Sequence, residues 1–238
     1  MPAPHNQLNI SFLDKTANPN LRSYYYQIIV QDSCYHNMDT TNLGQTMYLT
    51  AVGTPNGINT LTWNDYRSWY TGPREYDIYR SVDGINYSQL TIVPYQNNGI
   101  NTFADNIKNV TQGQGTFYYY IKAIEDTPSY YQFIDTSYSN IARAYQDPTV
   151  YIPDAFSPRG INKVFIPVGV FIDVSGYDLI ILNRWGIVMF ESNDPTVGWN
   201  GTAKSGKVEE EGVYVYLLTY TSSRGEYFQR KGTVTLLK

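Results

Sequence analysis

The amino-acid sequence predicts an all-β protein built from tandem β-sandwiches. Short runs of aromatic and β-branched residues follow one another along the chain, and several alternate between two faces with a period of two. Glycine, proline, asparagine and aspartate separate these runs, as is typical of tight turns between strands. Tyrosine, which tolerates half-exposed positions on a sheet, occurs 24 times in 238 residues. This length is enough for two domains of ordinary size.

Composition and charge argue against several classes of protein. The formal net charge is −4 and no basic cluster is present, so binding to nucleic acid is not expected. No apolar run approaches the roughly 20 residues that a membrane helix needs. The first residues, M-P-A-P-H-N-Q, lack the apolar segment of a signal peptide. We therefore expect the chain to be the C-terminal end of a longer precursor, with Met1 added by cloning.

Residues 1–52 are expected to be the C-terminal part of one sandwich. The run Ser23–Val30 has the same pattern as Phe117–Ile124 later in the chain. The short motifs that flank these two runs also recur in the same order: Phe12-Leu13-Asp14 and Asn42-Leu43 in the first copy, Phe103-Ala104-Asp105 and Asn140-Ile141 in the second. This order indicates an internal repeat at domain spacing, of which the first copy lacks its front strands.

Residues 53–147 are expected to form a complete sandwich that resembles a fibronectin type III domain. Trp63 is predicted to fill its core, and Tyr119, Ile121 and Ala123 to share one face of a long strand. The predicted strands are Leu61–Trp63, Glu75–Ser81, Tyr87–Val93, Thr116–Glu125 and Ser137–Ala144, with a hairpin turn at Ser81–Gly84.

The last region, residues 148–238, is predicted to be a sandwich of about seven short strands. Its clearest strands are Tyr177–Leu182, Ile187–Phe190, Val213–Tyr220 and Thr233–Leu237. Asn183-Arg184-Trp185-Gly186 is predicted to join the first two as a hairpin connection, with glycine where a positive φ is needed. Prolines in the junction Ala144–Pro153 favour a short, stiff connection, so we expect the two sandwiches to touch.

Three motifs in this last region carry a family resemblance: Asn183-Arg184-Trp185-Gly186, Gly198-Trp199-Asn200-Gly201 and Gly212-Val213-Tyr214. In this order, over Val150 to Lys238, they resemble the gliding-motility-associated C-terminal domain, the type B sorting domain of the type IX secretion system. The resemblance implies that the type IX secretion machinery carries the upstream cargo across the outer membrane. It also implies an outer-membrane β-barrel anchor protein that holds the cargo at the cell surface. The upstream repeats would then be stalk modules of an adhesin-like protein.

The loop Phe156–Phe165 departs from the family pattern. The family usually carries an acidic, glycine-rich loop here, whereas this chain has Arg159 and Lys163 where acidic side chains are expected. A hard cation needs several oxygen ligands, and the side chains of this loop offer only Asn162. We therefore predict no calcium here, and no metal or other cofactor elsewhere.

Two elements are predicted to contact the partner. The first is the hairpin tip, Arg184, Trp185 and Gly186, because tryptophan and arginine are frequent interface anchors. The second is the backbone edge of the final strand, which can accept an added strand, at Lys231, Gly232, Thr233, Val234, Thr235 and Leu236. The alternative for Trp185 is a core or rim position, which is also the interpretation we favour for Trp199.

No enzymatic activity is predicted. The single cysteine, Cys34, would need a histidine base, and His36 lies beside it in a run that is predicted to be a loop. An alternative function is glycan binding through the exposed aromatic residues Tyr66, Trp69, Tyr70, Tyr130 and Tyr131. A third is an accessory role beside a secreted hydrolase domain located upstream.

Overall fold

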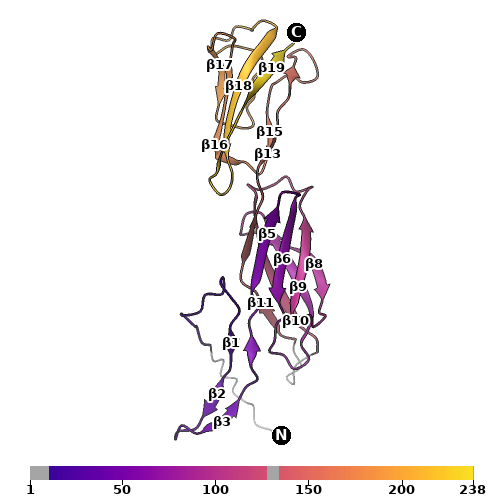
Figure 1. Ribbon diagram of the computed structural model, residues 1–238, viewed down its shortest axis with the longest axis vertical. Coiled ribbons are helices and arrows are strands. Elements are labelled where there is room, and N and C mark those ends of the chain that lie inside the picture. Colours follow the sequence, from indigo (N-terminus) through magenta and orange to yellow (C-terminus); the bar gives the residue numbers. More distant parts are fainter. Residues whose placement is uncertain (1–10, 128–133, 238) are drawn as a thin grey trace, which may run out of the picture.

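The computed structural model describes residues 11–127 and 134–237, which form strands and turns (Figure 1). The described part of the chain has no helix that could span a membrane. The predicted all-β fold class is confirmed. Two sandwiches follow one another along the long axis of the molecule, and a segment of short strands precedes them.

The N-terminal segment forms two separate two-stranded sheets. One pairs β1 (Tyr25–Tyr26) with β4 (Gly44–Gln45), and the other pairs β2 (Ile29–Gln31) with β3 (Asn37–Thr40). Every described residue before Met47 is exposed or half-buried. The run Ser23–Val30 is not one long strand like its counterpart in the middle sandwich, and within residues 11–127 and 134–237 no second sheet covers it.

The middle sandwich has a three-stranded and a five-stranded sheet. The first sheet has the order β5-β6-β9, with β5 (Leu49–Thr54), β6 (Ile58–Asn64) and β9 (Ile100–Asn106). The second has the order β11-β10-β7-β8, with β12 also paired to β10. Its strands are β7 (Pro73–Ser81), β8 (Ser88–Pro94), β10 (Thr116–Glu125), β11 (Thr136–Tyr138) and β12 (Ala142–Tyr145).

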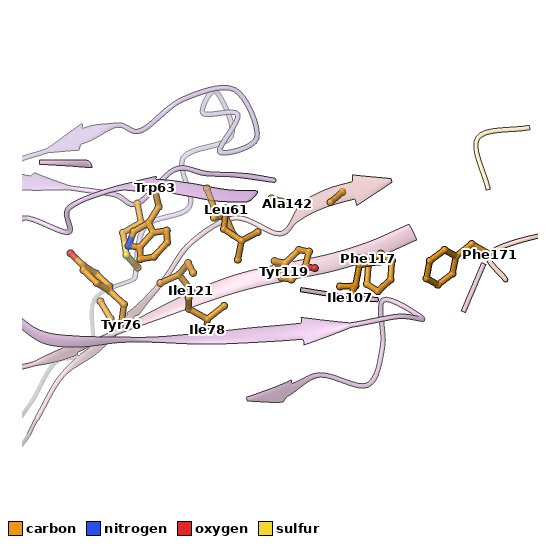
Figure 2. Close-up of a cluster of buried hydrophobic side chains, with 14 residues drawn as sticks. Leu61, Trp63, Tyr76, Ile78, Ile107, Phe117, Tyr119, Ile121, Ala142 and Phe171 are labelled. Carbon is orange, nitrogen blue, oxygen red and sulfur yellow. The ribbon is translucent and has the colours of Figure 1, made fainter. Parts of the chain in front are cut away.

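The core of the middle sandwich lies between these two sheets (Figure 2). Trp63 is buried and packs edge-on against Tyr76, with ring centroids 5.6 Å apart. Tyr119, Ile121 and Ala123 are fully buried on one face of β10, which confirms the alternation predicted for that strand.

The middle sandwich begins before residue 53, where the sequence placed its boundary. β5 starts at Leu49 and pairs with β6 along its whole length. Met47 and Leu49 are both buried in the same core as Trp63. The sequence does not reveal this boundary, because the residues of β5 also fit the end of the predicted repeat.

The C-terminal sandwich has the predicted seven strands. β13 (Thr149–Tyr151) pairs with β15 (Val168–Val170). The other sheet has the order β14-β19-β18-β16-β17, with strands β14 (Ala155–Phe156), β16 (Asp173–Leu182), β17 (Val188–Ser192), β18 (Gly212–Thr221) and β19 (Tyr227–Leu236). Trp199 is fully buried in its core against Phe156 and Tyr214, and its indole N–H donates to the Thr202 carbonyl at 2.8 Å.

Phe171, from the C-terminal sandwich, packs into the core of the middle one. Its side chain is 8% exposed and meets Phe117 edge-on, with ring centroids 5.5 Å apart (Figure 2). Its backbone φ is 63°, in the left-handed region that bulky residues rarely adopt. Such a conformation costs about 1–2 kcal/mol, and the packing of the ring has to offset this cost. The expected contact between the two sandwiches is therefore present.

Polar contacts reinforce this joint. Arg224, in the turn between β18 and β19, donates to the Asp147 carboxylate at 2.9 Å, and its guanidinium lies 5.9 Å from the Tyr145 ring centroid. The side chain of Gln146 donates to the buried Asn59 Oδ1 at 2.7 Å, and its backbone N–H donates to the Gly115 carbonyl at 2.8 Å. The connecting segment is thus bonded to the middle sandwich through Gln146 and to the C-terminal sandwich through Asp147.

Gly115 provides a test of this joint. Its φ is 89°, and a Cβ at this position would lie 2.7 Å from the Gln146 carbonyl oxygen and 2.9 Å from Phe171 Cβ. Gly99 has a similar φ of 77° and open space around it. We expect Gly99→Ala to cost about 1 kcal/mol through backbone strain alone. Gly115→Ala should cost about 2 kcal/mol more in thermal or denaturant unfolding, because it also disrupts the joint. Equal losses for the two variants would contradict the packing described.

Candidate partner-binding site

The tip of the β16–β17 hairpin is a rigid turn. The side-chain oxygen of Asn183 accepts hydrogen bonds from the backbone N–H groups of Trp185 at 2.9 Å and Ile187 at 3.0 Å. Gly186 has a φ of 79°, as predicted for this position, and its N–H donates to the Asn183 carbonyl at 2.9 Å. Asparagine and glycine thus fix the turn without help from the two side chains between them.

The two side chains between them, Arg184 and Trp185, face solvent. Trp185 is 75% exposed, so the core position considered for it is wrong, whereas Trp199 is a core residue. The Arg184 guanidinium lies 5.2 Å from the Trp185 ring centroid, which is cation–π distance. An exposed indole beside a guanidinium, on a turn that is already ordered, can bind a partner with little loss of backbone entropy.

The final strand, β19, is not a simple edge strand. It lies between β18, with which it pairs along its whole length, and β14, which pairs with Thr235 and Leu236 in parallel. The sequence placed a free backbone edge at Lys231 to Leu236, and the last two of these residues are covered. Strand β14 comes from far earlier in the chain, which explains why the sequence pattern did not reveal it.

The open part of the β19 edge lies toward Tyr227. The N–H groups of Thr235 and Leu237 donate to Asp154 and Phe156, on the side away from β18. Because backbone groups alternate sides along a strand, those of Lys231 and Thr233 also point away from β18. No pairing covers them among the residues that the structure describes. The backbone edge available for strand addition is therefore the segment Tyr227–Thr233.

The side chains of β19 divide between the two faces of the sheet. Val234 and Leu236 are buried, as their alternation with threonine predicted. Gly232 also faces inward, because a Cβ there would lie 2.5 Å from the hydroxyl oxygen of Tyr216. The side chains at positions 231, 233 and 235 are therefore the ones that β19 presents on the outer face.

The structure brings the hairpin tip and the end of β19 to one end of the sheet. Leu182, just before the tip, is opposite Val215 on β18, which is opposite Thr233 on β19. Val213 is 59% exposed and lies opposite Thr235. We call these exposed and half-exposed positions the docking face: Leu182, Arg184, Trp185, Val213, Val215, Thr233 and Thr235. The sequence identified its two ends but not the apolar strip between them.

An open groove of about 230 Å³ adjoins the docking face. Asn183, Arg184 and Trp185 line one side of the groove, and the segment Lys207–Tyr214 lines the other. This segment contains the acidic run Glu209–Glu211. Burial raises the pKa of the Tyr214 phenol, and the nearby Glu209 and Glu210 raise it further. The groove therefore combines two aromatic residues, Trp185 and Tyr214, with two cations, Arg184 and Lys207, and the carboxylates of Glu209–Glu211.

Other residues that the sequence singled out lie elsewhere. Trp69 packs against the middle core and Tyr66, at a centroid distance of 4.4 Å, whereas Tyr70 is fully exposed. Tyr130 and Tyr131 lie outside the described residues. The Nδ1 atom of His36 lies 3.2 Å from the Asp32 carboxylate, and Cys34 is exposed. The run after Cys34 is only partly a loop, because β3 begins at Asn37.

Comparison with known families identifies the C-terminal sandwich. Residues 150–236 match the model of the CHU_C type IX secretion signal domain. The match confirms the resemblance inferred from the three motifs and indicates that the chain carries a type IX secretion signal. No curated protein sequence matches the chain.

Several solved structures match the chain at low similarity. A tetra-tandem repeat from the extending region of a large adhesion protein is 11% identical, with 90% of this chain and 56% of that one covered and a TM-score of 0.41. The fibronectin(III)-like modules of Clostridium thermocellum CbhA are 9% identical, with 81% and 93% covered and a TM-score of 0.28. Dimeric latent PorU from Porphyromonas gingivalis is 11% identical, with 90% and 20% covered and a TM-score of 0.28. At these scores, none of the three assigns a function to this chain.

The two tryptophans of the C-terminal sandwich should respond oppositely to truncation. Trp199→Ala removes a fully buried ring and should cost about 3–5 kcal/mol of unfolding free energy. Trp185→Ala removes an exposed ring and should change stability by no more than about 0.5 kcal/mol. Thermal melting of the two variants beside the native chain tests this. Similar losses for both would mean that Trp185 also supports the fold.

Proposed function

We propose that residues 148–238 are the signal that the type IX secretion machinery recognises, and that they then anchor the protein on an outer-membrane β-barrel partner. The domains upstream would serve as the stalk of an adhesin-like surface protein. The observation that supports this proposal most strongly is the match of residues 150–236 to the type IX secretion signal domain. The proposed role is non-catalytic.

The docking face supports the second half of the proposal. A membrane-bound partner needs a surface on the signal domain that remains exposed after the domain has folded. Trp185 and Val213 are exposed apolar side chains at the same end of the sheet. The open segment of the β19 edge begins near that end, at Thr233, and runs away from it toward Tyr227. An exposed apolar patch and an unpaired strand edge are each typical of an interaction surface.

The position of the docking face also fits anchoring. The hairpin tip and the end of β19 lie at the end of the C-terminal sandwich that is remote from the joint with the middle sandwich (Figure 1). A partner bound there would leave the middle sandwich and the N-terminal segment free to project away from it.

Export of a reporter tests the sorting role. A neutral reporter with a signal peptide is fused to residues 47–238, which include the middle sandwich because Phe171 is buried against it. We expect the reporter outside cells that carry a matching type IX system. A fusion to residues 47–147 should stay in the periplasm. A periplasmic 47–238 fusion, while the host still exports its own cargo, would contradict the sorting role.

Retention of the same reporter tests the docking face. Arg184→Ala and Trp185→Ala should leave export intact but weaken co-purification with the barrel, by about 2 kcal/mol each if these residues are interface hot spots. Tyr151→Ala, which removes an exposed ring from β13, is the matched control. Unchanged capture of both tip variants would exclude the hairpin tip as the contact.

A further inference from the structure

The outer face of the five-stranded sheet in the middle sandwich carries a cluster of tyrosines. Tyr76 and Ile78 of β7 point into the core, so Asp77 and Tyr79 lie on the opposite, outer face. Tyr79 is opposite Tyr120 of β10, and Asp77 is opposite Lys122. We call six of these outer positions the tyrosine face. They are Asp77 and Tyr79 of β7, Tyr87 of the turn before β8, Tyr118 and Tyr120 of β10, and Tyr138 of β11.

The rings on this face hold one another in place. Tyr120 is central: its ring stacks on Tyr79 at 4.7 Å with an interplanar angle of 11°, and Tyr87 and Tyr138 lie 5.0 and 6.0 Å from it. Tyr138 remains 58% exposed, and the other rings are half-buried. Because the rings already pack against one another, a ligand would bind them with little further loss of side-chain entropy.

Asp77 is the unusual member of the tyrosine face. Its side chain is only 6% exposed, and its Oδ1 atom has no hydrogen-bond partner among the described residues. The hydroxyl of Tyr87 is also buried and has no hydrogen-bond partner among the described residues. A buried polar atom without a partner lowers stability, so its presence in a native structure calls for an explanation. Burial, and then repulsion from Glu75, raises the pKa of Asp77.

We propose that the tyrosine face binds a neutral glycan, whose hydroxyl groups donate to Asp77 while its apolar ring face lies on the tyrosines. Sugar rings present C–H groups on one face, and the partial positive charge of these groups suits the negative face of an aromatic ring. Side chains two residues apart on a strand are about 7 Å apart, so one sugar unit can cover Tyr79 and still reach Asp77.

The charges around the face favour a neutral ligand over a charged one. Lys122 lies opposite Asp77, and the Arg143 guanidinium lies 5.3 Å from the Tyr118 ring centroid, so a cationic ligand would meet two cations. Asp77 and Glu75 in turn disfavour an anionic ligand such as a nucleic acid. The ligand must still supply hydrogen-bond donors to a recessed oxygen, and sugar hydroxyls are small, neutral donors.

This site differs from the loop that contains Trp69 and Tyr70. That loop offers one free ring, because Trp69 packs against the core. The tyrosine face offers several adjacent rings and an unsatisfied acceptor. The inference does not depend on the secretion signal, because the face belongs to the middle sandwich.

The full 238-residue chain, probed with an array of neutral oligosaccharides and then titrated with those that bind, tests the proposal. Tyr138→Ala, which removes the most exposed ring of the face, should weaken binding about fivefold to tenfold, as expected for one lost aromatic contact. Tyr70→Ala, in the other loop, is the matched control and should bind normally. An array with no neutral glycan bound, or equal loss in both variants, would overturn the proposal. Capture of a protein through this face, with no glycan bound, would also overturn it.

Asp77→Asn separates a ligand-binding role from a structural one. Asparagine has nearly the same shape and removes a negative charge from a buried carboxylate whose Oδ1 has no hydrogen-bond donor, so the melting temperature should rise. The glycan should nevertheless bind at least about tenfold more weakly, because hydrogen bonds to a charged acceptor are the stronger ones. Unchanged or tighter glycan binding by this variant would refute the role assigned to Asp77.

Discussion

The packing between the two sandwiches is centred on one aromatic side chain that crosses from one to the other. Phe171 is placed just after β15, at the start of the C-terminal sandwich, yet its ring completes the core that Phe117 and Ile107 leave open in the middle sandwich (Figure 2). The left-handed backbone at Phe171 is unfavourable by itself, so it persists because the ring is buried. Gly115 provides the space this packing needs, and the Arg224–Asp147 pair supports it at the rim. The C-terminal sandwich therefore packs directly against the middle sandwich and is not connected to it by a flexible linker alone.

In both sandwiches the inner faces of the sheets form the core and the outer faces carry the candidate binding surfaces. The inner faces bury Trp63, Tyr119, Trp199 and Leu218, and this burial fixes strand order and register. The outer faces are then free to carry function, and the two sandwiches use them differently. The C-terminal sheet exposes an apolar strip that leads to an arginine–tryptophan turn. The middle sheet exposes interlocked tyrosines around a carboxylate that has no donor for one of its oxygens.

Local features of both sandwiches could be predicted from the sequence because they depend on neighbouring residues. The period-two alternation in Thr116–Glu125 and the glycine of the Asn183–Gly186 turn each carry a local signal, and both predictions are confirmed. Features that depend on distant partners could not be predicted. The β14 segment covers the end of β19 from about 80 residues away, and the assembly of the tyrosine face requires strands β7, β10 and β11 to be paired first. The backbone strain at Phe171 also has no sequence signature, because only the packed joint imposes it.

The most direct test of this account is hydrogen–deuterium exchange on the full chain, with Phe171→Ala compared to the native protein. The substitution lies in the C-terminal sandwich, but the account predicts faster exchange in the middle one, at the start of β10 around Phe117 and near Ile107. The far end of that sandwich, around Trp63, should be much less affected. Unchanged protection around Phe117 would contradict the account, because it would mean that the two sandwiches do not share a core.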